Sequence, residues 1–213
     1  MKVYLIPGLA ADERVFRHIC LPPSFEAVHL KWIPPTTSES LGDYALRLSS
    51  QINTSEPFAL IGLSFGGMIA MEIAARFPVR QIILISSIPS PDQLPRYYKW
   101  AGQIGLHKAL PITLIKKAAL VKRYFTRESS EDRNMLRHMI RQSDAQFIRW
   151  AIKAVLHWKH SPVPQQILHI HGTSDEILPL RYTHPTHLLR GGGHLMVMNR
   201  AKEINAILLE VLT

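Results

Sequence analysis

Short apolar runs alternate with segments of helical spacing along most of the chain. We predict strands over residues 2–6, 27–32, 58–61, 80–86, 166–171 and 186–189. Helices are predicted over residues 12–19, 40–52 and 67–75, and apolar residues at 204, 207, 208 and 211 have the spacing of a last helix. Strands that alternate with helices imply a parallel, doubly wound sheet of about six strands between two helical layers.

Residues 92–160 interrupt this alternation with a predominantly helical stretch. Prolines open it at Pro91 and Pro95 and close it at Pro162 and Pro164. One apolar stripe at helical spacing comprises Phe147, Trp150, Ala151, Ala154, Val155 and Trp158. Met135, Met139 and Ile140 are expected on the inner face of another helix, with Ser129 and Ser130 in its N-terminal capping region. We interpret residues 92–160 as a helical cap inserted into a single core formed by 1–91 and 161–213.

Composition supports one globular domain. The chain has 213 residues and a hydrophobic fraction of 46%, which suffices for one sizeable core. No apolar run reaches the roughly 18 residues that span a membrane. The N-terminal segment does not resemble a signal peptide, so we expect a cytoplasmic protein. The single cysteine, Cys20, excludes an internal disulfide framework, and we expect it to be a buried small hydrophobe.

Charge is unevenly distributed. The formal net charge is +9, and residues 92–160 hold 14 Lys and Arg against 5 Asp and Glu. The predicted cap therefore carries the whole imbalance. A basic cap could attract an anionic substrate, an acidic lipid or an acidic partner, or could simply present solvated helix faces. No recognisable nucleic-acid-binding motif accompanies the charge, so we expect no nucleic-acid partner.

The most informative motif is Gly62-Leu63-Ser64-Phe65-Gly66, which fits G-x-S-x-G. It lies between a predicted buried strand and a predicted helix, as a nucleophile on a sharp strand-to-helix turn requires. Gly62 and Gly66 leave room for that turn, because a Cβ at either position would meet neighbouring backbone. The helix N-terminus provides free N–H groups and a partial positive charge beside Ser64.

An acid and a base follow in the order that this motif predicts. Asp175 comes just after a predicted strand, and His194 follows three glycines before the last helix. Asp92, which follows the fourth predicted strand, and Glu176 remain rivals for the acid. His169 and His171 share one face of their strand, but no third ligand for a metal is evident.

These residue types together suit covalent catalysis. Imidazole can accept the serine proton, and a carboxylate fixes the tautomer of the ring and stabilises the imidazolium. Backbone N–H groups would stabilise the tetrahedral oxyanion. We expect one from Phe65, the residue after the nucleophile, and the other from Leu9 in the loop after the first strand.

With these motifs the chain resembles the small serine hydrolases of the α/β-hydrolase fold, over residues 2–91 and 161–213. The resemblance implies a mainly parallel sheet, a triad of Ser64, Asp175 and His194, and frequent esterase activity. Two departures stand out. The oxyanion loop has Pro7-Gly8 where many members have His-Gly, and the two leading antiparallel strands of larger members are not expected here.

We therefore expect a cofactor-free, metal-free serine hydrolase of the carboxylesterase type. Its substrate would be an ester or thioester of a small, apolar acyl group. Two alternatives stay open. The same triad also serves C–C bond hydrolases, lyases and acyltransferases, and a protein of this fold can bind a small molecule without turning it over.

Overall fold

Six parallel strands form one sheet, as the apolar pattern predicts. The computed structural model describes residues 1–103, 129–159 and 167–212. The strand order is β2-β1-β3-β4-β5-β6, and every neighbouring pair is parallel. The strands are β1 (Lys2–Ile6), β2 (Glu26–His29), β3 (Phe58–Leu63), β4 (Gln81–Ile85), β5 (Ile167–Gly172) and β6 (His187–Leu189).

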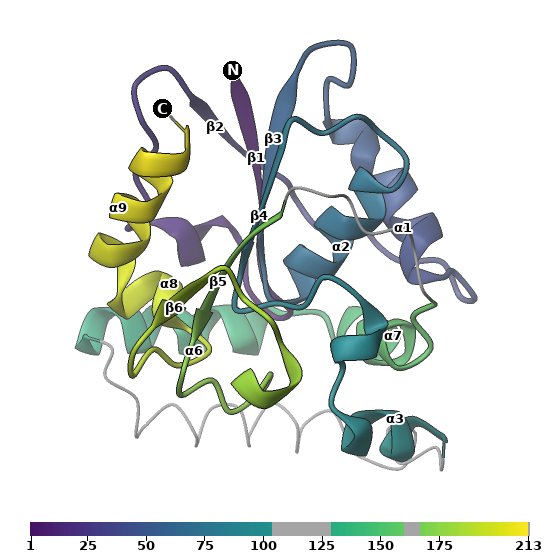
Figure 1. Ribbon diagram of the computed structural model, residues 1–213. Coiled ribbons are helices and arrows are strands. Elements are labelled where there is room, and N and C mark those ends of the chain that lie inside the picture. Colours follow the sequence, from purple (N-terminus) through teal and green to yellow (C-terminus); the bar gives the residue numbers. More distant parts are fainter. Residues whose placement is uncertain (104–128, 160–166, 213) are drawn as a thin grey trace.

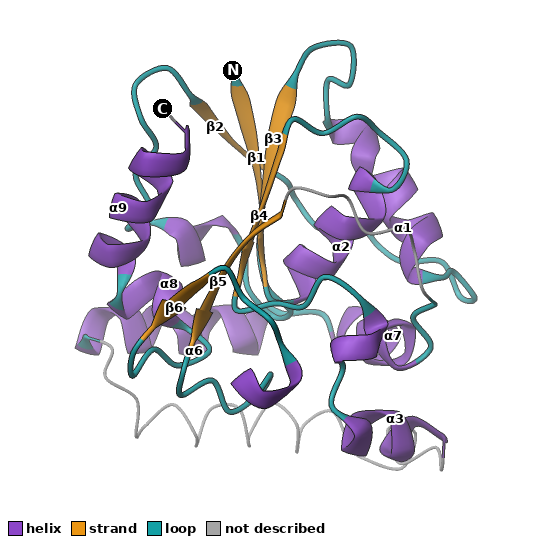
Figure 2. Ribbon diagram, viewed as in Figure 1, coloured by secondary structure: helices purple, strands orange, loops and turns teal. Residues whose placement is uncertain are grey.

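Helices cover both faces of the sheet, as Figures 1 and 2 show. The α-helices are α1 (Leu41–Leu48), α2 (Phe65–Ala74), α3 (Arg96–Gln103), α6 (Ser130–Gln142), α7 (Ala145–Leu156), α8 (Met196–Asn199) and α9 (Ala201–Leu212). The 3-10 helices are η1 (Glu13–Phe16), η2 (Ser49–Gln51), η3 (Pro91–Gln93) and η5 (Leu180–Tyr182). Helices α1 and α2 cover one face, whereas α8 and α9 cover the other. The result is a three-layer α/β/α arrangement.

Strand periodicity divides the core into two layers. In β1, Tyr4 and Ile6 pack with α1 and α2, and Val3 and Leu5 pack with η1, α8 and α9. Successive side chains of a strand point to opposite faces. Because both faces are covered, the central strand β3 is buried along its whole length, as is typical of parallel sheets.

Two predicted helices begin at a side-chain cap but are shorter than predicted. The side chain of Ser40 accepts a hydrogen bond from the Asp43 N–H and caps α1. This helix ends at Leu48 and continues only as η2. Asp12 caps in the same way, yet only the single 3-10 turn η1 follows it, in place of a helix over 12–19.

The prediction for Cys20 was wrong, because its side chain is exposed. Cys20 lies in the irregular segment after η1, where its N–H donates a hydrogen bond to Asn205 Oδ1 of α9. The expectation of burial rested on the general preference of cysteine for the interior. An irregular surface segment does not follow that preference.

The segment predicted as a helical cap contributes α3, α6 and α7. These helices lie beyond the carboxyl ends of the strands (Figure 1). Ser129 caps α6 by accepting from the Asp132 N–H, and Met139 and Ile140 are buried as expected. The predicted stripe lies on the buried face of α7, although Trp158 falls beyond the end of that helix. Residues 104–128, and the prolines at 162 and 164, lie outside the described residues.

No helix in the described ranges is both long enough and apolar enough to cross a lipid bilayer.

Candidate active site

The predicted nucleophile Ser64 lies at a sharp turn between β3 and α2. Its backbone has φ 52° and ψ −117°, a region that residues other than glycine seldom occupy. The flanking glycines make this turn sterically feasible. A Cβ on Gly62 would lie 2.4 Å from Gly67 Cα, and one on Gly66 would lie 2.2 Å from the Ile6 carbonyl oxygen. The strained turn points Ser64 away from the sheet.

Two hydrogen bonds hold this turn, one with the end of β4 and one with the segment just after it. The Ser64 N–H donates to the Ile85 carbonyl at 2.9 Å. The Ser87 hydroxyl donates to the Ser64 carbonyl at 2.6 Å. Ser87 is fully buried, and sequence reasoning missed it. The only available signal was its place just after the apolar run of β4.

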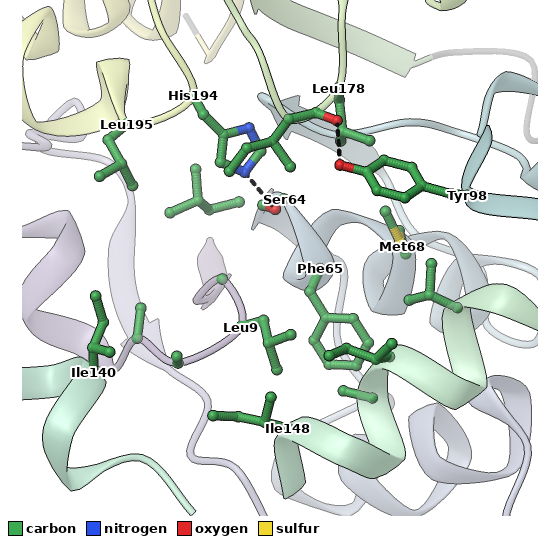
Figure 3. Close-up of a pocket in the computed structure, with 18 of the residues that line it drawn as sticks. Leu9, Ser64, Phe65, Met68, Tyr98, Ile140, Ile148, Leu178, His194 and Leu195 are labelled. Carbon is green, nitrogen blue, oxygen red and sulfur yellow. Dashed lines mark hydrogen bonds between the residues drawn. The ribbon is translucent and has the colours of Figure 1, made fainter. Parts of the chain in front are cut away.

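The structure brings Ser64, His194 and Asp175 into one hydrogen-bonded line. His194 Nε2 lies 2.8 Å from Ser64 Oγ, and His194 Nδ1 lies 2.8 Å from Asp175 Oδ2. A carboxylate can only accept, so Nδ1 carries the ring proton and Nε2 is free to accept the serine proton. Figure 3 shows the His194 ring directed at the Ser64 hydroxyl.

Backbone donors fix the other carboxylate oxygen of Asp175. Its Oδ1 accepts from the N–H groups of Ile177 and Leu178, both at 2.9 Å. Burial alone would raise the pKa of this carboxyl, but the His194 ring and the backbone donors outweigh burial, so the pKa lies below its usual value. Asp175 is therefore an anion at neutral pH, buried and fully oriented.

The rivals for the acid lie elsewhere. Asp92 is exposed in η3, and Glu176 is an exposed neighbour of Asp175. The hydrogen bond of His194 goes to Asp175. The geometry therefore favours the acid that directly follows β5.

The loop after β1 lies beside the Ser64 turn because of the strand register. Ile6 pairs with Gly62 across β1 and β3, so Leu9 approaches the start of α2. Phe65 is the first residue of α2, and its N–H has no acceptor within the helix. In the described ranges, neither the Leu9 N–H nor the Phe65 N–H donates to another group of the protein. Leu9 and Phe65 both line the cavity above Ser64.

An apolar cavity of about 380 Å³ opens above Ser64. Its floor comes from the core, and its roof comes from α6 and α7, with Leu136, Ile140, Ile148, Ala151, Ile152 and Val155. Figure 3 shows Ile140 and Leu195 on one side of Ser64 and Met68 and Tyr98 on the other. Burial raises the pKa of Tyr98 to about 12, and its hydroxyl donates to the Ile177 carbonyl at 3.2 Å.

Ion pairs connect α6 to the segment that continues from the Leu9 loop. Arg17 lies 2.9 Å from Glu131 and 3.1 Å from the buried Asp132. His18 Nε2 lies within hydrogen-bonding distance of Asp132 Oδ1, at 3.2 Å. The described part of the predicted cap is thus tied directly to the core beside the cavity. Among the described residues, no group of three or more His, Cys, Asp or Glu is arranged to hold a metal ion.

Comparison with known proteins agrees with this architecture. The sequence profile described as the alpha/beta hydrolase family matches residues 3–207. The chain belongs to this family. Membership of the alpha/beta hydrolase family supports hydrolase activity for this chain. No curated protein sequence matches it.

Several solved structures share the fold of this alpha/beta hydrolase at low sequence identity. An esterase (EaEST) from Exiguobacterium antarcticum has a TM-score of 0.75 and 14% identity, over 98% of this chain and 90% of that one. A thermophilic esterase from Thermogutta terrifontis has a TM-score of 0.69 and 18% identity, over 100% and 89%. MenH from S. aureus has a TM-score of 0.71 and 16% identity, over 100% and 93%.

Proposed function

We propose that this alpha/beta hydrolase is a serine esterase or thioesterase that uses Ser64, His194 and Asp175 as a catalytic triad. The observation that carries the proposal is the line of two 2.8 Å hydrogen bonds from Asp175 through His194 to Ser64. This line ends beneath an apolar cavity that can receive an acyl group. A hydroxyl so placed is activated by the neighbouring base.

The reaction has two halves. Ser64 Oγ attacks the carbonyl carbon, and its proton passes to His194 Nε2. The tetrahedral intermediate collapses, the bond to the leaving oxygen or sulfur breaks, and His194 returns the proton to that atom. A water molecule then attacks the acyl-enzyme while His194 takes one of its protons. Release of the carboxylic acid restores Ser64.

Charge that develops during both halves would be met by fixed groups. The Leu9 and Phe65 N–H groups would bind the oxyanion, and the N-terminus of α2 adds a favourable field. The Asp175 carboxylate would stabilise the imidazolium form of His194. Preorganised donors of this kind need no rearrangement as the charge appears, and each contributes roughly 3–4 kcal/mol.

The cavity lining favours a small apolar acyl group. Aliphatic and aromatic side chains from the core and from α6 and α7 surround Ser64, and contact with apolar surface stabilises a bound hydrocarbon chain. Its volume of about 380 Å³ is near the lower end of small-molecule sites. In this proposal α6 and α7 act as a cap that shapes the pocket and excludes water.

Hydrolysis of p-nitrophenyl acetate, butyrate and octanoate tests this function. We expect turnover by the unmodified protein, with kcat/KM depending on chain length. Ser64→Ala should abolish turnover and leave the melting temperature nearly unchanged, whereas the exposed control Ser55→Ala should keep full activity. Undiminished turnover in Ser64→Ala would defeat the assignment. Product analysis with thioesters and C–C substrates would separate the related reactions that the same triad supports.

A further inference from the structure

A pair of buried imidazoles lies behind the proposed catalytic acid. His169 and His171 are 2% and 0% exposed. Leu168 and Ile170 of the same strand pack with α8 and α9, so the two histidines point to the opposite face of β5. The mechanism above uses neither ring. Buried histidines that serve no catalytic step need a physical explanation, because each carries two polar ring atoms.

The hydrogen bonds of this pair fix both tautomers. His171 Nε2 lies 2.8 Å from the Leu178 carbonyl oxygen, which can only accept, so this nitrogen carries the proton. His171 Nδ1 is then an acceptor, and it lies 3.2 Å from His169 Nε2, which must donate. The remaining nitrogen, His169 Nδ1, carries no proton and has no hydrogen-bond partner in the described residues. His169 therefore donates to His171, and His171 donates to the Leu178 carbonyl.

Leu178 belongs to the turn that holds Asp175. Its N–H donates to Asp175 Oδ1 while its carbonyl accepts from His171. The backbone N–H and carbonyl of Leu178 thus connect the His171 ring to the Asp175 carboxylate. His171 Nε2 also lies 3.5 Å from Asp175 Oδ2, the oxygen that His194 contacts. That distance is too long for a strong hydrogen bond, so the coupling runs mainly through Leu178.

Both rings are neutral at pH 7. Burial and the neighbouring His171 together lower the pKa of His169 to about 4, although the Ser87 backbone and the Asp175 carboxylate oppose this shift. Burial also lowers the pKa of His171, although the Asp175 carboxylate opposes this and His194 adds to it. A neutral pair can donate to Leu178 without placing a second positive charge next to His194.

We propose that His171, supported by His169, is a positioning residue for the triad, because it anchors the Asp175–Leu178 turn and so holds the carboxylate in the orientation that His194 requires. This inference rests on the proposed function. Neither ring touches the cavity, so the expected effect is on the geometry of the triad and not on substrate binding.

Substitutions at both positions test the inference. His171→Leu removes the donor to Leu178, and a misplacement of the acid by about 1 Å should lower kcat roughly tenfold to a hundredfold. KM for p-nitrophenyl butyrate should change less than about threefold. His171→Gln can still present an N–H near the Leu178 carbonyl and should recover part of kcat. His169→Leu leaves His171 without its donor and should give an intermediate loss.

A proton NMR signal distinguishes a misplaced Asp175 carboxylate from a general loss of packing. The proton between His194 and Asp175 should give a low-field proton resonance in the unmodified protein, and His171→Leu should shift or broaden it. Thr186→Val is the matched control. It removes the two hydrogen bonds of the Thr186 hydroxyl with the His169 backbone and its contact with His187 Nδ1, and it leaves both rings in place. Its kcat and its low-field resonance should be unchanged within about twofold.

Several outcomes would overturn the inference. One is a folded His171→Leu protein with kcat within about threefold of the unmodified protein and an unshifted resonance. Another is an equal loss of kcat in Thr186→Val. Should His171→Leu not fold, normal kcat and an unshifted resonance in His169→Leu would decide against it. If the unmodified protein hydrolyses no ester, the proposed function fails instead, and the resonance still reports on the position of Asp175.

Discussion

At the scale of single residues, the proposed chemistry depends most on the orientation of one carboxylate. Asp175 has its carboxylate oxygens held by three donors, which come from His194, Ile177 and Leu178. An amide in its place would keep an acceptor oxygen for the backbone donors. It would also present an NH₂ group to His194 and favour the tautomer that cannot accept the proton of Ser64.

We therefore expect Asp175→Asn to fold normally and to lose about 10⁴-fold in kcat, as the equivalent change does in serine proteases. Steady-state kinetics on p-nitrophenyl butyrate would measure the loss. Asp92→Asn is the matched control at the exposed rival position and should keep kcat within about threefold. A loss of less than tenfold in Asp175→Asn would move the acid to another residue.

The buried imidazole of His169 should make stability depend on pH. Its pKa is about 4 in the folded chain against 6.5 for the free side chain. Between these values the unfolded chain binds a proton that the folded chain does not, so stability falls as the pH falls through this window. The free energy of unfolding should decrease by about 2 kcal/mol from this residue between pH 7 and 5. The lowered pKa of Asp175 affects the free energy of unfolding only below about pH 4, outside the interval from pH 7 to pH 5.

Urea unfolding at pH 7 and pH 5 measures this effect. His169→Leu should lose about 2 kcal/mol less than the unmodified protein over the same interval. The exposed His138→Gln should lose as much as the unmodified protein. Identical losses in His169→Leu and the unmodified protein would show that this ring titrates normally in the folded state.

At the scale of secondary structure, a very close contact lies between α2 and the loop after β1. A Cβ on Gly66 would lie 2.2 Å from the Ile6 carbonyl oxygen and 2.3 Å from that of Pro7. Both atoms belong to backbone, so the loop or the helix would have to move. We expect Gly66→Ala to lower the free energy of unfolding by about 3 kcal/mol or more.

Chemical denaturation would measure this loss. Gly193→Ala is the control, because a Cβ there would have no neighbour within 4 Å, and its stability should be unchanged within about 0.5 kcal/mol. Equal stability of Gly66→Ala and the unmodified protein would mean that this contact is not as close as described.

Helix α7 should determine how long an acyl chain the cavity accepts. Ile152 lies on its inner face and lines the cavity. In Ile152→Trp the larger ring would occupy part of the space, so kcat/KM for the octanoate ester should fall about tenfold while that for the acetate changes less than threefold. Arg149→Ala, on the exposed face of α7, should change neither. An equal fall for both esters would place the acyl chain elsewhere.

Sequence periodicity predicted the existence of the helices and strands better than it predicted where they begin and end. Phe58–Ile61 is a buried apolar run, and it indeed begins β3, which continues to Leu63. By contrast, residues 12–19 form only a 3-10 turn. Periodicity reports which residues can be buried together. It does not report where the backbone must turn to meet the next element, so the observed boundaries differ from the predicted ones.

At the scale of the whole molecule, the topology explains why distant residues meet. Strand order reverses between β1 and β3, and ligands of doubly wound sheets bind beyond the carboxyl ends of strands at such a point. Leu9 follows β1, Ser64 follows β3, Asp175 follows β5 and His194 follows β6. The order of strands thus places the proposed oxyanion loop next to the proposed nucleophile.

Motif spacing predicted the site residues that follow strand ends. It did not predict the neighbouring residues that hold them in place. The bracing hydroxyl of Ser87 and the imidazoles of His169 and His171 belong to no motif. Their roles depend on contacts between β4, β5 and the Asp175 turn, which only the tertiary arrangement defines. The basic residues of the predicted cap lie partly outside the described residues, and an anionic or acidic partner for them stays a prediction.

Labelling with a fluorophosphonate tests the central claim most directly, because the reagent reacts with a serine only when a base and an oxyanion site activate it. Intact mass should show one phosphonyl group per folded chain, and peptide mapping should place it on Ser64, with no label on Ser64→Ala. A folded, unlabelled protein, or a label on another serine, would contradict the account.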